Sequence, residues 1–140
     1  MVDQNCAYCM EGELVAKFGI KICELETSKV YLFKEQSHPG RCIVAHKKHV
    51  GDMNELTAEE RAAYFEDVAR VARAIMKAFN PDKVNYGAYG DTGHHLHFHL
   101  CPKYKDEFEW GGVFLMNPDK KYLTDAEYAE MIEKIKANIK

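Results

Sequence analysis

The sequence predicts an α+β fold in which a mainly antiparallel sheet of about five strands packs against a long central helix and a C-terminal helix. Three observations favour this class. Short β-rich runs separated by turn residues dominate residues 14–45. Two long amphipathic segments each begin with a capping-box pattern, and strands and helices do not alternate regularly as they do around a parallel sheet.

The first strands follow from alternation and turn signals. Two runs of alternating apolar and polar residues, around Ile20 and Val30, flank a turn near residues 26–28. A Pro39-Gly40 turn then precedes the continuous apolar run at residues 42–45. Alternating runs are typical of half-buried strands and a short continuous run of a buried strand, so this region predicts three strands.

Two helices are bounded by recognisable signals. Thr57 and Glu60 form a capping box, and the apolar positions that follow recur at helical spacing until Pro81 stops the helix. Thr124 and Glu127 repeat the pattern, which predicts a C-terminal helix over about residues 124–139.

The remaining strands are predicted at residues 83–90 and 95–100. Residues two apart in a strand point to the same face, so His95, His97 and His99 form one imidazole row. The opposite face carries the apolar residues Leu96, Phe98 and Leu100. If that face packs on the core, the histidines line the side that a ligand can reach.

Composition limits the classes of protein that need consideration. A chain of 140 residues is the usual length of one domain, here predicted over residues 1–140. A formal net charge of -3 argues against general nucleic-acid binding. The chain has no apolar stretch of membrane-spanning length and no signal-peptide pattern, so we expect a cytoplasmic protein without a membrane partner. In a reducing compartment the Cys6 and Cys9 CxxC pair indicates metal or redox chemistry.

Two chemical explanations fit the histidine row. Three imidazoles could hold a catalytic zinc and leave a fourth position for water. Alternatively, a neutral imidazole could attack phosphorus as a nucleophile while its neighbours orient it and carry protons. Packing alone is a weak explanation for three histidines in register behind a glycine-rich link.

Several motifs together resemble a known family. The stretch "HLHFHLC", residues 95–101, fits the pattern His-φ-His-φ-His-φ-φ, in which φ is apolar. An N-terminal CxxC, an "HPG" turn leading into a strand that ends in "HKKH", and a long central helix occur in the matching order. Over roughly residues 6–112 the chain resembles the histidine triad (HIT) family of nucleotidyl hydrolases and transferases, which implies a HIT-like fold and a nucleotide substrate.

The resemblance assigns roles to individual residues. His97 matches the histidine that attacks the α-phosphorus of a nucleotide and forms a covalent nucleotidyl-imidazole. His99 would contact the phosphate and assist the leaving group, as would the hydroxyl of Thr92. Asn85 resembles the polar residue that steadies the site, and Trp110 resembles a tryptophan that forms a wall for a base.

The same resemblance implies a structural zinc site. Branches of the family bind zinc through two cysteines, a loop histidine and the first triad histidine, and Cys6, Cys9, His49 and His95 match these positions. Without the resemblance, the CxxC could equally be a redox pair. Zinc on His95 would remove this residue from a three-imidazole catalytic site.

Departures from the family pattern concern the substrate. Asp91 stands where many members carry glutamine, and Glu35 is only a rough substitute for the acidic residue that holds the ribose in one branch. The chain resembles the diadenosine-polyphosphate hydrolase-like branch, and we expect a homodimer. A metal-dependent hydrolase, a nucleotidyltransferase and a non-catalytic nucleotide-binding module remain alternatives.

Overall fold

The computed structural model of the protein describes residues 3–140. Its centre is one five-stranded sheet in the order β1-β2-β3-β5-β4, with every neighbouring pair antiparallel. The strands are β1 (Gly19–Glu24), β2 (Ser28–Phe33), β3 (Cys42–His46), β4 (Lys83–Gly87) and β5 (His97–Lys103). The helices are α1 (Ala7–Met10), α2 (Gly12–Ala16), α3 (Ala58–Phe79) and α4 (Asp125–Asn138), with a 3-10 turn, η1, at Met53–Glu55. The predicted α+β fold with an antiparallel sheet is confirmed.

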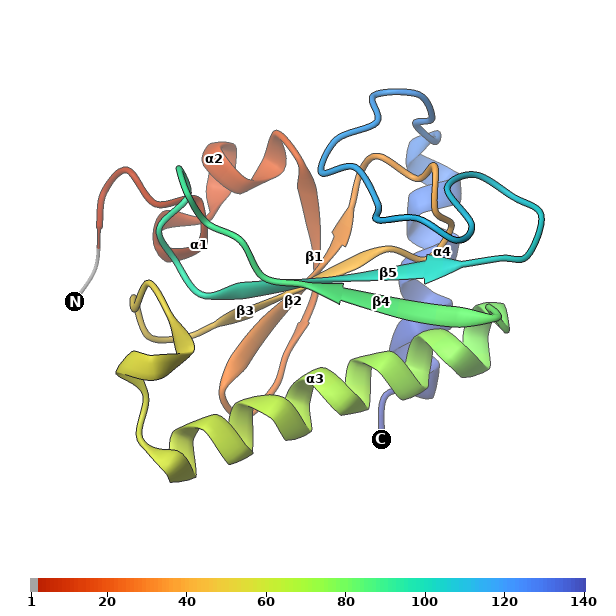
Figure 1. Ribbon diagram of the computed structural model, residues 1–140. Helices are drawn as coiled ribbons and strands as arrows, with labels where there is room; N and C mark the ends of the chain where they lie inside the picture. The colour runs from red at the N-terminus through yellow and green to blue at the C-terminus, as the bar shows by residue number, and fades with distance from the viewer. Residues whose placement is uncertain (1–2) are drawn as a thin grey trace.

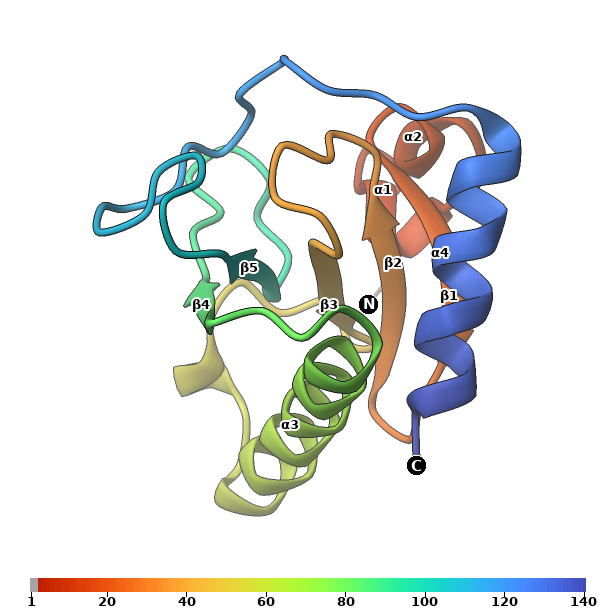
Figure 2. The same cartoon turned by 90° about the vertical axis from the view of Figure 1, so that its right-hand side faces the viewer.

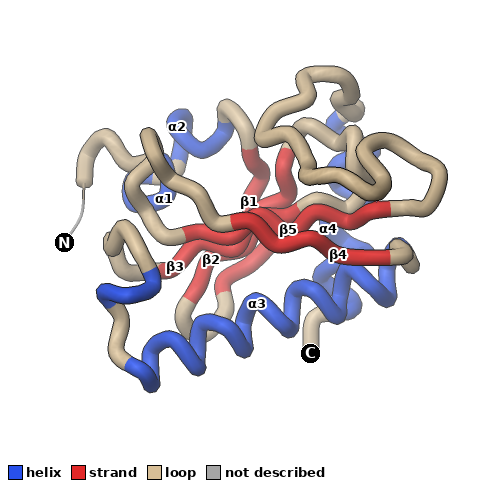
Figure 3. The backbone as a smooth tube through the Cα atoms, viewed as in Figure 1, coloured by secondary structure: helices blue, strands red, loops and turns tan. Residues whose placement is uncertain are grey.

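The two faces of the sheet have different covers (Figure 1, Figure 2). Helices α3 and α4 pack on one face and enclose the larger hydrophobic core. Helices α1 and α2 lie over the other face, where Tyr8 and Val15 join a smaller cluster with Tyr31 and Ile43. The long irregular segment after β5 also crosses this second face before it reaches α4 (Figure 3). On this second face, strand β5 is therefore covered by loops and short helices rather than by a long helix.

Helix α3 begins and ends where its capping signals predict. The backbone N–H of Glu60 donates to Thr57 Oγ1 (3.1 Å), and the N–H of Thr57 donates to the Glu60 carboxylate (2.9 Å). The helix ends at Asn80 in the left-handed conformation, before Pro81. Helix α4 has the same capping box at Thr124. That residues 1–140 form a single HIT domain stays a prediction.

Asp67 joins α3 to the turn between β1 and β2. Its side chain is 2% exposed and accepts hydrogen bonds from the N–H (2.9 Å) and hydroxyl (2.8 Å) of Thr27 and the hydroxyl of Ser28 (2.8 Å). The Ser28 hydroxyl is buried and the Thr27 donors are partly buried, so loss of the carboxylate would leave them poorly satisfied. The carboxylate therefore fixes the position of α3 against the far end of the sheet.

Strand β5 differs from the sequence prediction at both ends. It begins at His97 rather than His95, because the N–H of His95 bonds to Gly93 O in a turn, and it continues to Lys103. The triad histidines also do not line an open face. His95, His97 and His99 are 2%, 9% and 3% exposed. Tyr8 of α1 packs against His95 and His97, and Phe114 of the segment after β5 packs against His99. The short helices α1 and α2 are not among the elements predicted from the sequence.

Candidate active site and metal centre

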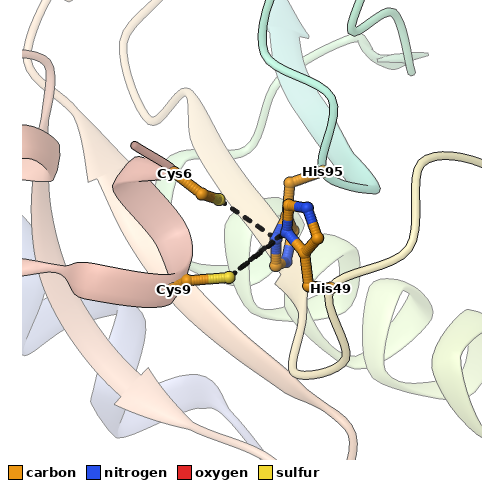
Figure 4. A group of neighbouring side chains, drawn as sticks. All are labelled: Cys6, Cys9, His49 and His95. Atoms are coloured by element: carbon orange, nitrogen blue, oxygen red, sulfur yellow. Dashed lines mark hydrogen bonds between the residues drawn. The ribbon is translucent and has the colours of Figure 1, made fainter. Parts of the chain in front are cut away.

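Two cysteines and two histidines from distant parts of the chain converge on one point (Figure 4). Cys6 precedes α1 and Cys9 lies in it, while His49 follows β3 and His95 precedes β5. Cys6 Sγ lies 3.3 Å from His95 Nδ1, Cys9 Sγ lies 3.2 Å from His49 Nδ1, and the two Nδ1 atoms are 3.0 Å apart. These are the four residues that the family resemblance implies for zinc.

The donor atoms fit a tetrahedral zinc ion. Zinc bonds of about 2.3 Å to sulfur and 2.0 Å to nitrogen place neighbouring ligand atoms roughly 3.3–3.8 Å apart. The sulfur–nitrogen and nitrogen–nitrogen separations of 3.0–3.6 Å lie within or slightly below this range, and all four donor atoms lie within 4.8 Å of one another. The tautomer of His95 also fits, because its Nε2–H donates to His46 O across 2.6 Å and leaves the Nδ1 lone pair facing the cysteines. Burial lowers the pKa of His95 to about 4, which keeps this ligand neutral.

His97, the middle histidine, is held by a neighbouring backbone group. Its Nδ1–H donates to the carbonyl oxygen of His95 across 2.6 Å. A neutral imidazole carries one proton, so Nε2 keeps its lone pair. Burial lowers the pKa of His97 and favours this neutral form. The arrangement is suited to a nitrogen nucleophile, because the reactive atom and its tautomer are both fixed before a substrate binds.

Tyr8 covers His97 from the N-terminal side. This residue lies between the two cysteines of the CxxC, and its ring centre is 4.9 Å from that of His97 and 5.4 Å from that of His95. The side chain is 7% exposed. The segment that supplies two metal ligands therefore also packs an aromatic ring on the candidate nucleophile.

His99 contacts a buried arginine that the sequence analysis did not single out. Arg41 Nη2 donates to His99 Nδ1 across 3.0 Å. Burial, followed by the charge of Arg41, lowers the pKa of His99 to about 2. A signal was present, because Arg41 stands in phase with Ile43 and Ala45 at the start of a buried strand, where a charged side chain is unusual.

Asn85 and Trp110 line a cavity on the same face of the sheet. Asn85 pairs with Cys101 across β4 and β5, two residues beyond His99. The cavity has a volume of about 280 Å³ and is also lined by Lys83 and Lys103. Lys103 is buried and donates to two backbone carbonyls of the loop that carries Trp110. A larger cavity of about 350 Å³ lies beside His46 and the first turn of α3. No triad histidine lines either cavity.

The structure does not bring every candidate residue into the site. Asp91 and Thr92 are exposed on the loop between β4 and β5, and neither side chain hydrogen bonds to another residue of the described chain, 3–140. Glu35 is occupied elsewhere. Its carboxylate accepts hydrogen bonds from Ser37 and from the N–H groups of Lys120 and Lys121. We therefore see no free carboxylate at Glu35 for a ribose.

Comparison with known families gives a match over much of the chain. A family model described as "HIT domain" matches residues 19–106, which is more than half of the chain. The chain belongs to the HIT family. The match spans all five strands and α3, and it ends within the loop after β5.

Relatives of this HIT protein include proteins with named activities. It is 28% identical over 123 residues to the protein named hit from Bacillus subtilis, covering 83% of each chain. It is 27% identical over 116 residues to an adenosine 5'-monophosphoramidase from Schizosaccharomyces pombe, covering 76% of this chain and 80% of the relative. It is 29% identical over 98 residues to a bis(5'-adenosyl)-triphosphatase from Dictyostelium discoideum, covering 66% of this chain and 65% of the relative.

Solved structures share the fold of this HIT protein. A histidine triad protein from Sinorhizobium meliloti superposes with a TM-score of 0.83 at 23% identity, covering 91% of this chain and 94% of the other. A zinc-bound histidine triad family protein from Mycobacterium smegmatis gives a TM-score of 0.68 at 22% identity, covering 96% of this chain and 92% of the other. Within residues 3–140, no helix is both long enough and apolar enough to cross a bilayer.

Proposed function

We propose that this protein is a nucleotidyl hydrolase that cleaves the α-phosphate bond of adenylylated compounds or dinucleoside polyphosphates through a covalent nucleotidyl-His97 intermediate. The observation that carries the proposal is the hydrogen bond from His97 Nδ1–H to His95 O, which leaves Nε2 as a fixed nucleophile. The two relatives named as a phosphoramidase and a triphosphatase support the substrate class.

The proposed reaction has two displacement steps. His97 Nε2 attacks the α-phosphorus, a nitrogen–phosphorus bond forms, and the leaving group departs with its bonding electron pair. Water then attacks the same phosphorus, an oxygen–phosphorus bond forms, and the water releases a proton to the solvent. The nitrogen–phosphorus bond breaks and its electron pair returns to Nε2. His99 assists by donating its Nε2–H to the phosphate, where it stabilises the charge that develops in the transition state.

Residues around the triad have proposed supporting roles. Asn85 steadies the substrate from the cavity described above, and Trp110 offers an aromatic wall for a base at its mouth. Thr92 supplies a hydroxyl to the leaving group when the exposed loop folds over the substrate. Asp91 adds a negative charge to the same loop and influences which phosphate compounds are accepted.

Cys6, Cys9, His49 and His95 would hold a zinc ion. A closed site with four protein ligands supplies structural cross-linking, here between the N-terminus and the triad strand. Because His95 Nδ1 faces the cysteines and its Nε2 donates to His46 O, neither ring nitrogen of His95 is directed at an ion shared with His97 and His99. This geometry supports a nucleophilic His97 over a catalytic zinc held by three histidines.

The expected homodimer is part of the proposal. Strand β4 is an edge of the sheet, and its Tyr86 is 51% exposed. An unpaired edge beside exposed aromatic surface is a suitable place for a second copy. Sedimentation equilibrium would find a dimer if this is correct and a monomer at all concentrations if it is not. The cytoplasmic location stays a prediction from the sequence.

The experiment that tests the proposed activity replaces the nucleophile. His97→Ala should abolish both turnover and covalent labelling of the protein by a substrate labelled at the α-phosphate, with unchanged circular dichroism. His94→Ala is the matched control, because His94 is exposed and lies outside the row. Turnover by His97→Ala would contradict the proposal.

A substrate panel separates an enzyme from a binding module. Phosphoramidates, acyl-adenylates and dinucleoside polyphosphates should each be incubated with the wild-type protein. Nucleotide binding without product from any of them would identify a non-catalytic module. Transfer of the nucleotide to an acceptor other than water would identify a transferase.

A further inference from the structure

Arg41 is a buried cation on the triad face of the sheet. Its side chain is 0% exposed and stands two residues before Ile43, which pairs with His99. The guanidinium carbon lies 4.1 Å from the ring centre of Phe33 and 4.9 Å from that of Phe114. The two aromatic rings hold the guanidinium in place and exclude water from it.

The guanidinium connects His99 to the segment that covers the site. Nη1 donates to Leu115 O (3.1 Å), while Nη2 donates to Met116 O (2.8 Å) and to His99 Nδ1 (3.0 Å). Among the described residues, 3–140, Arg41 forms no ion pair with a carboxylate, and its Nε has no partner. The carboxylates of Glu35 and Glu109 attract this buried charge through space but do not contact it, so Nη2 remains available to His99.

This contact determines where His99 carries its proton. A guanidinium has only donor groups, so the nitrogen that it contacts must accept. His99 Nδ1 is therefore unprotonated, and the single proton of a neutral ring lies on Nε2. A second proton would place an N–H group against Nη2 at 3.0 Å and two positive charges side by side.

The other neighbours of His99 do not oppose this state. His97 and Cys101 are the titratable groups on either side of it on the same face of β5. The ring centres of His97 and His99 are 5.3 Å apart, and burial raises the pKa of Cys101 to about 12, which keeps this thiol neutral. Strand β2 contributes the ring of Phe33 and the segment after β5 the ring of Phe114, neither of which is charged. Strand β4 places Gly87 opposite His99. Burial and Arg41 together lower the pKa of His99, in agreement with the contacts.

We propose that Arg41 is a positioning residue that holds His99 neutral with its proton on Nε2, and that the site consequently favours leaving groups that depart as anions, such as polyphosphates, over amines. A neutral imidazole that gave up its only proton would become an imidazolate, so His99 donates a hydrogen bond without transferring the proton. A polyphosphate oxygen takes the electron pair of the breaking bond and leaves without a proton, whereas an amine must be protonated before it leaves. The preference among leaving groups rests on the proposed function.

Nitrogen NMR of protein labelled with ¹⁵N-histidine tests the proton position independently of any activity. His99→Gln identifies the His99 signals by their loss. Wild type should show a protonated Nε2 and an unprotonated Nδ1 from about pH 5 to 8. Arg41→Met should let His99 titrate in this range and populate both tautomers, and Arg41→Lys should restore part of the wild-type behaviour.

The test has a matched control variant, and the wild-type spectrum alone can also contradict the proposal. Arg61→Met removes another arginine that donates to two backbone carbonyls, and it should leave the His99 signals unchanged. Unchanged His99 signals in a folded Arg41→Met protein would overturn the proposal. If Arg41→Met does not fold, the wild-type spectrum decides, because a proton on Nδ1 or an ordinary titration of His99 would overturn it.

The preference among leaving groups is tested by two substrates. Wild type should have a higher kcat/KM for diadenosine tetraphosphate than for adenosine 5'-monophosphoramidate. Arg41→Met should reduce the ratio of these two kcat/KM values by about tenfold or more at acidic pH. A ratio that does not change overturns this half of the proposal while the NMR result stands. If neither substrate reacts with wild type, the proposed function fails rather than the assignment of the proton.

Discussion

The Nδ1–H of His97 donates to the backbone carbonyl oxygen of His95, and the two atoms are 2.6 Å apart. His95 is at the same time the residue whose Nδ1 meets Cys6 and Cys9. One residue thus joins the candidate metal site to the candidate nucleophile. Displacement of His95 would move the carbonyl that fixes the tautomer of His97, which links metal loading to reactivity.

Loss of both cysteines should remove the metal. Elemental analysis of wild type should give about one zinc per chain, and the Cys6→Ser, Cys9→Ser double variant should give almost none, with a lower melting temperature. Cys23→Ser is the control, because Cys23 is half-buried in β1 outside the cluster. Zinc retained by the double variant would instead indicate binding by the triad.

Buried histidines should make the protein sensitive to mild acid. Burial lowers the pKa of His38, His46 and His99, so the unfolded chain binds more protons than the folded chain below about pH 6.5. The free energy of unfolding should be constant above about pH 7.5 and should fall as the pH drops toward about 4.5, by up to roughly 1.4 kcal/mol per pH unit for each such histidine.

Urea denaturation at a series of pH values measures this dependence. His38→Gln should make the free energy of unfolding depend less steeply on pH below pH 6.5, since His38 is 2% exposed. His94→Gln, at an exposed position, should leave the slope unchanged. A stability that does not vary between these pH values would show that the histidines do not become protonated on unfolding.

Removal of the Asp67 carboxylate should destabilise the fold. Asp67→Ala leaves three donors of Thr27 and Ser28 without their acceptor, at a cost of about 2–4 kcal/mol. Asp67→Asn keeps one acceptor oxygen and should lower the free energy of unfolding by less than Asp67→Ala does. Glu66→Ala, an exposed neighbour on the same helix, should change the free energy of unfolding by less than about 0.5 kcal/mol.

Trp110 should report nucleotide binding directly. It is the single tryptophan of the sequence, is 40% exposed and lines the cavity beside Asn85. Titration with AMP should change its fluorescence in a saturable manner, and Asn85→Ala should weaken the apparent affinity. Asn54→Ala, in the 3-10 turn, is the control. A saturable change that Asn85→Ala leaves unaltered would place the nucleotide elsewhere.

The charge of Asp91 should influence substrate preference. Asp91→Gln removes an exposed negative charge from the loop before the triad and should raise kcat/KM for polyphosphate substrates a few-fold at low salt, with a smaller effect at high salt. Asp106→Asn removes a charge from the exposed turn after β5 and should have little effect. Equal effects of both variants would indicate that only net charge matters.

Much of the fold could be predicted because its signals are local. Thr57 and Glu60 satisfy the first backbone donors of α3 within four residues, and Pro81 excludes further helix wherever the segment lies. Helix α1 could not be predicted in this way, because four residues are too few for a periodic pattern. Strand β5 begins two residues later than predicted, because the N–H of His95 bonds to Gly93 O in a turn and the N–H of Leu96 bonds to Val50 O in the loop after β3. The sequence pattern does not show these contacts.

The sequence by itself determined the chemical groups: three histidines at alternate positions, a CxxC pair and a loop histidine. Tertiary structure decided what each imidazole does. A hydrogen-bond partner determines which ring nitrogen carries the proton. The partners of His95 and His99 come from distant segments, whereas His97 bonds to the carbonyl of His95, two residues away. Cys6 and Cys9 meet His95 across more than eighty residues, and Arg41 meets His99 across fifty-eight. Spacing along the chain cannot encode these contacts, because they form only when the sheet brings the strands together.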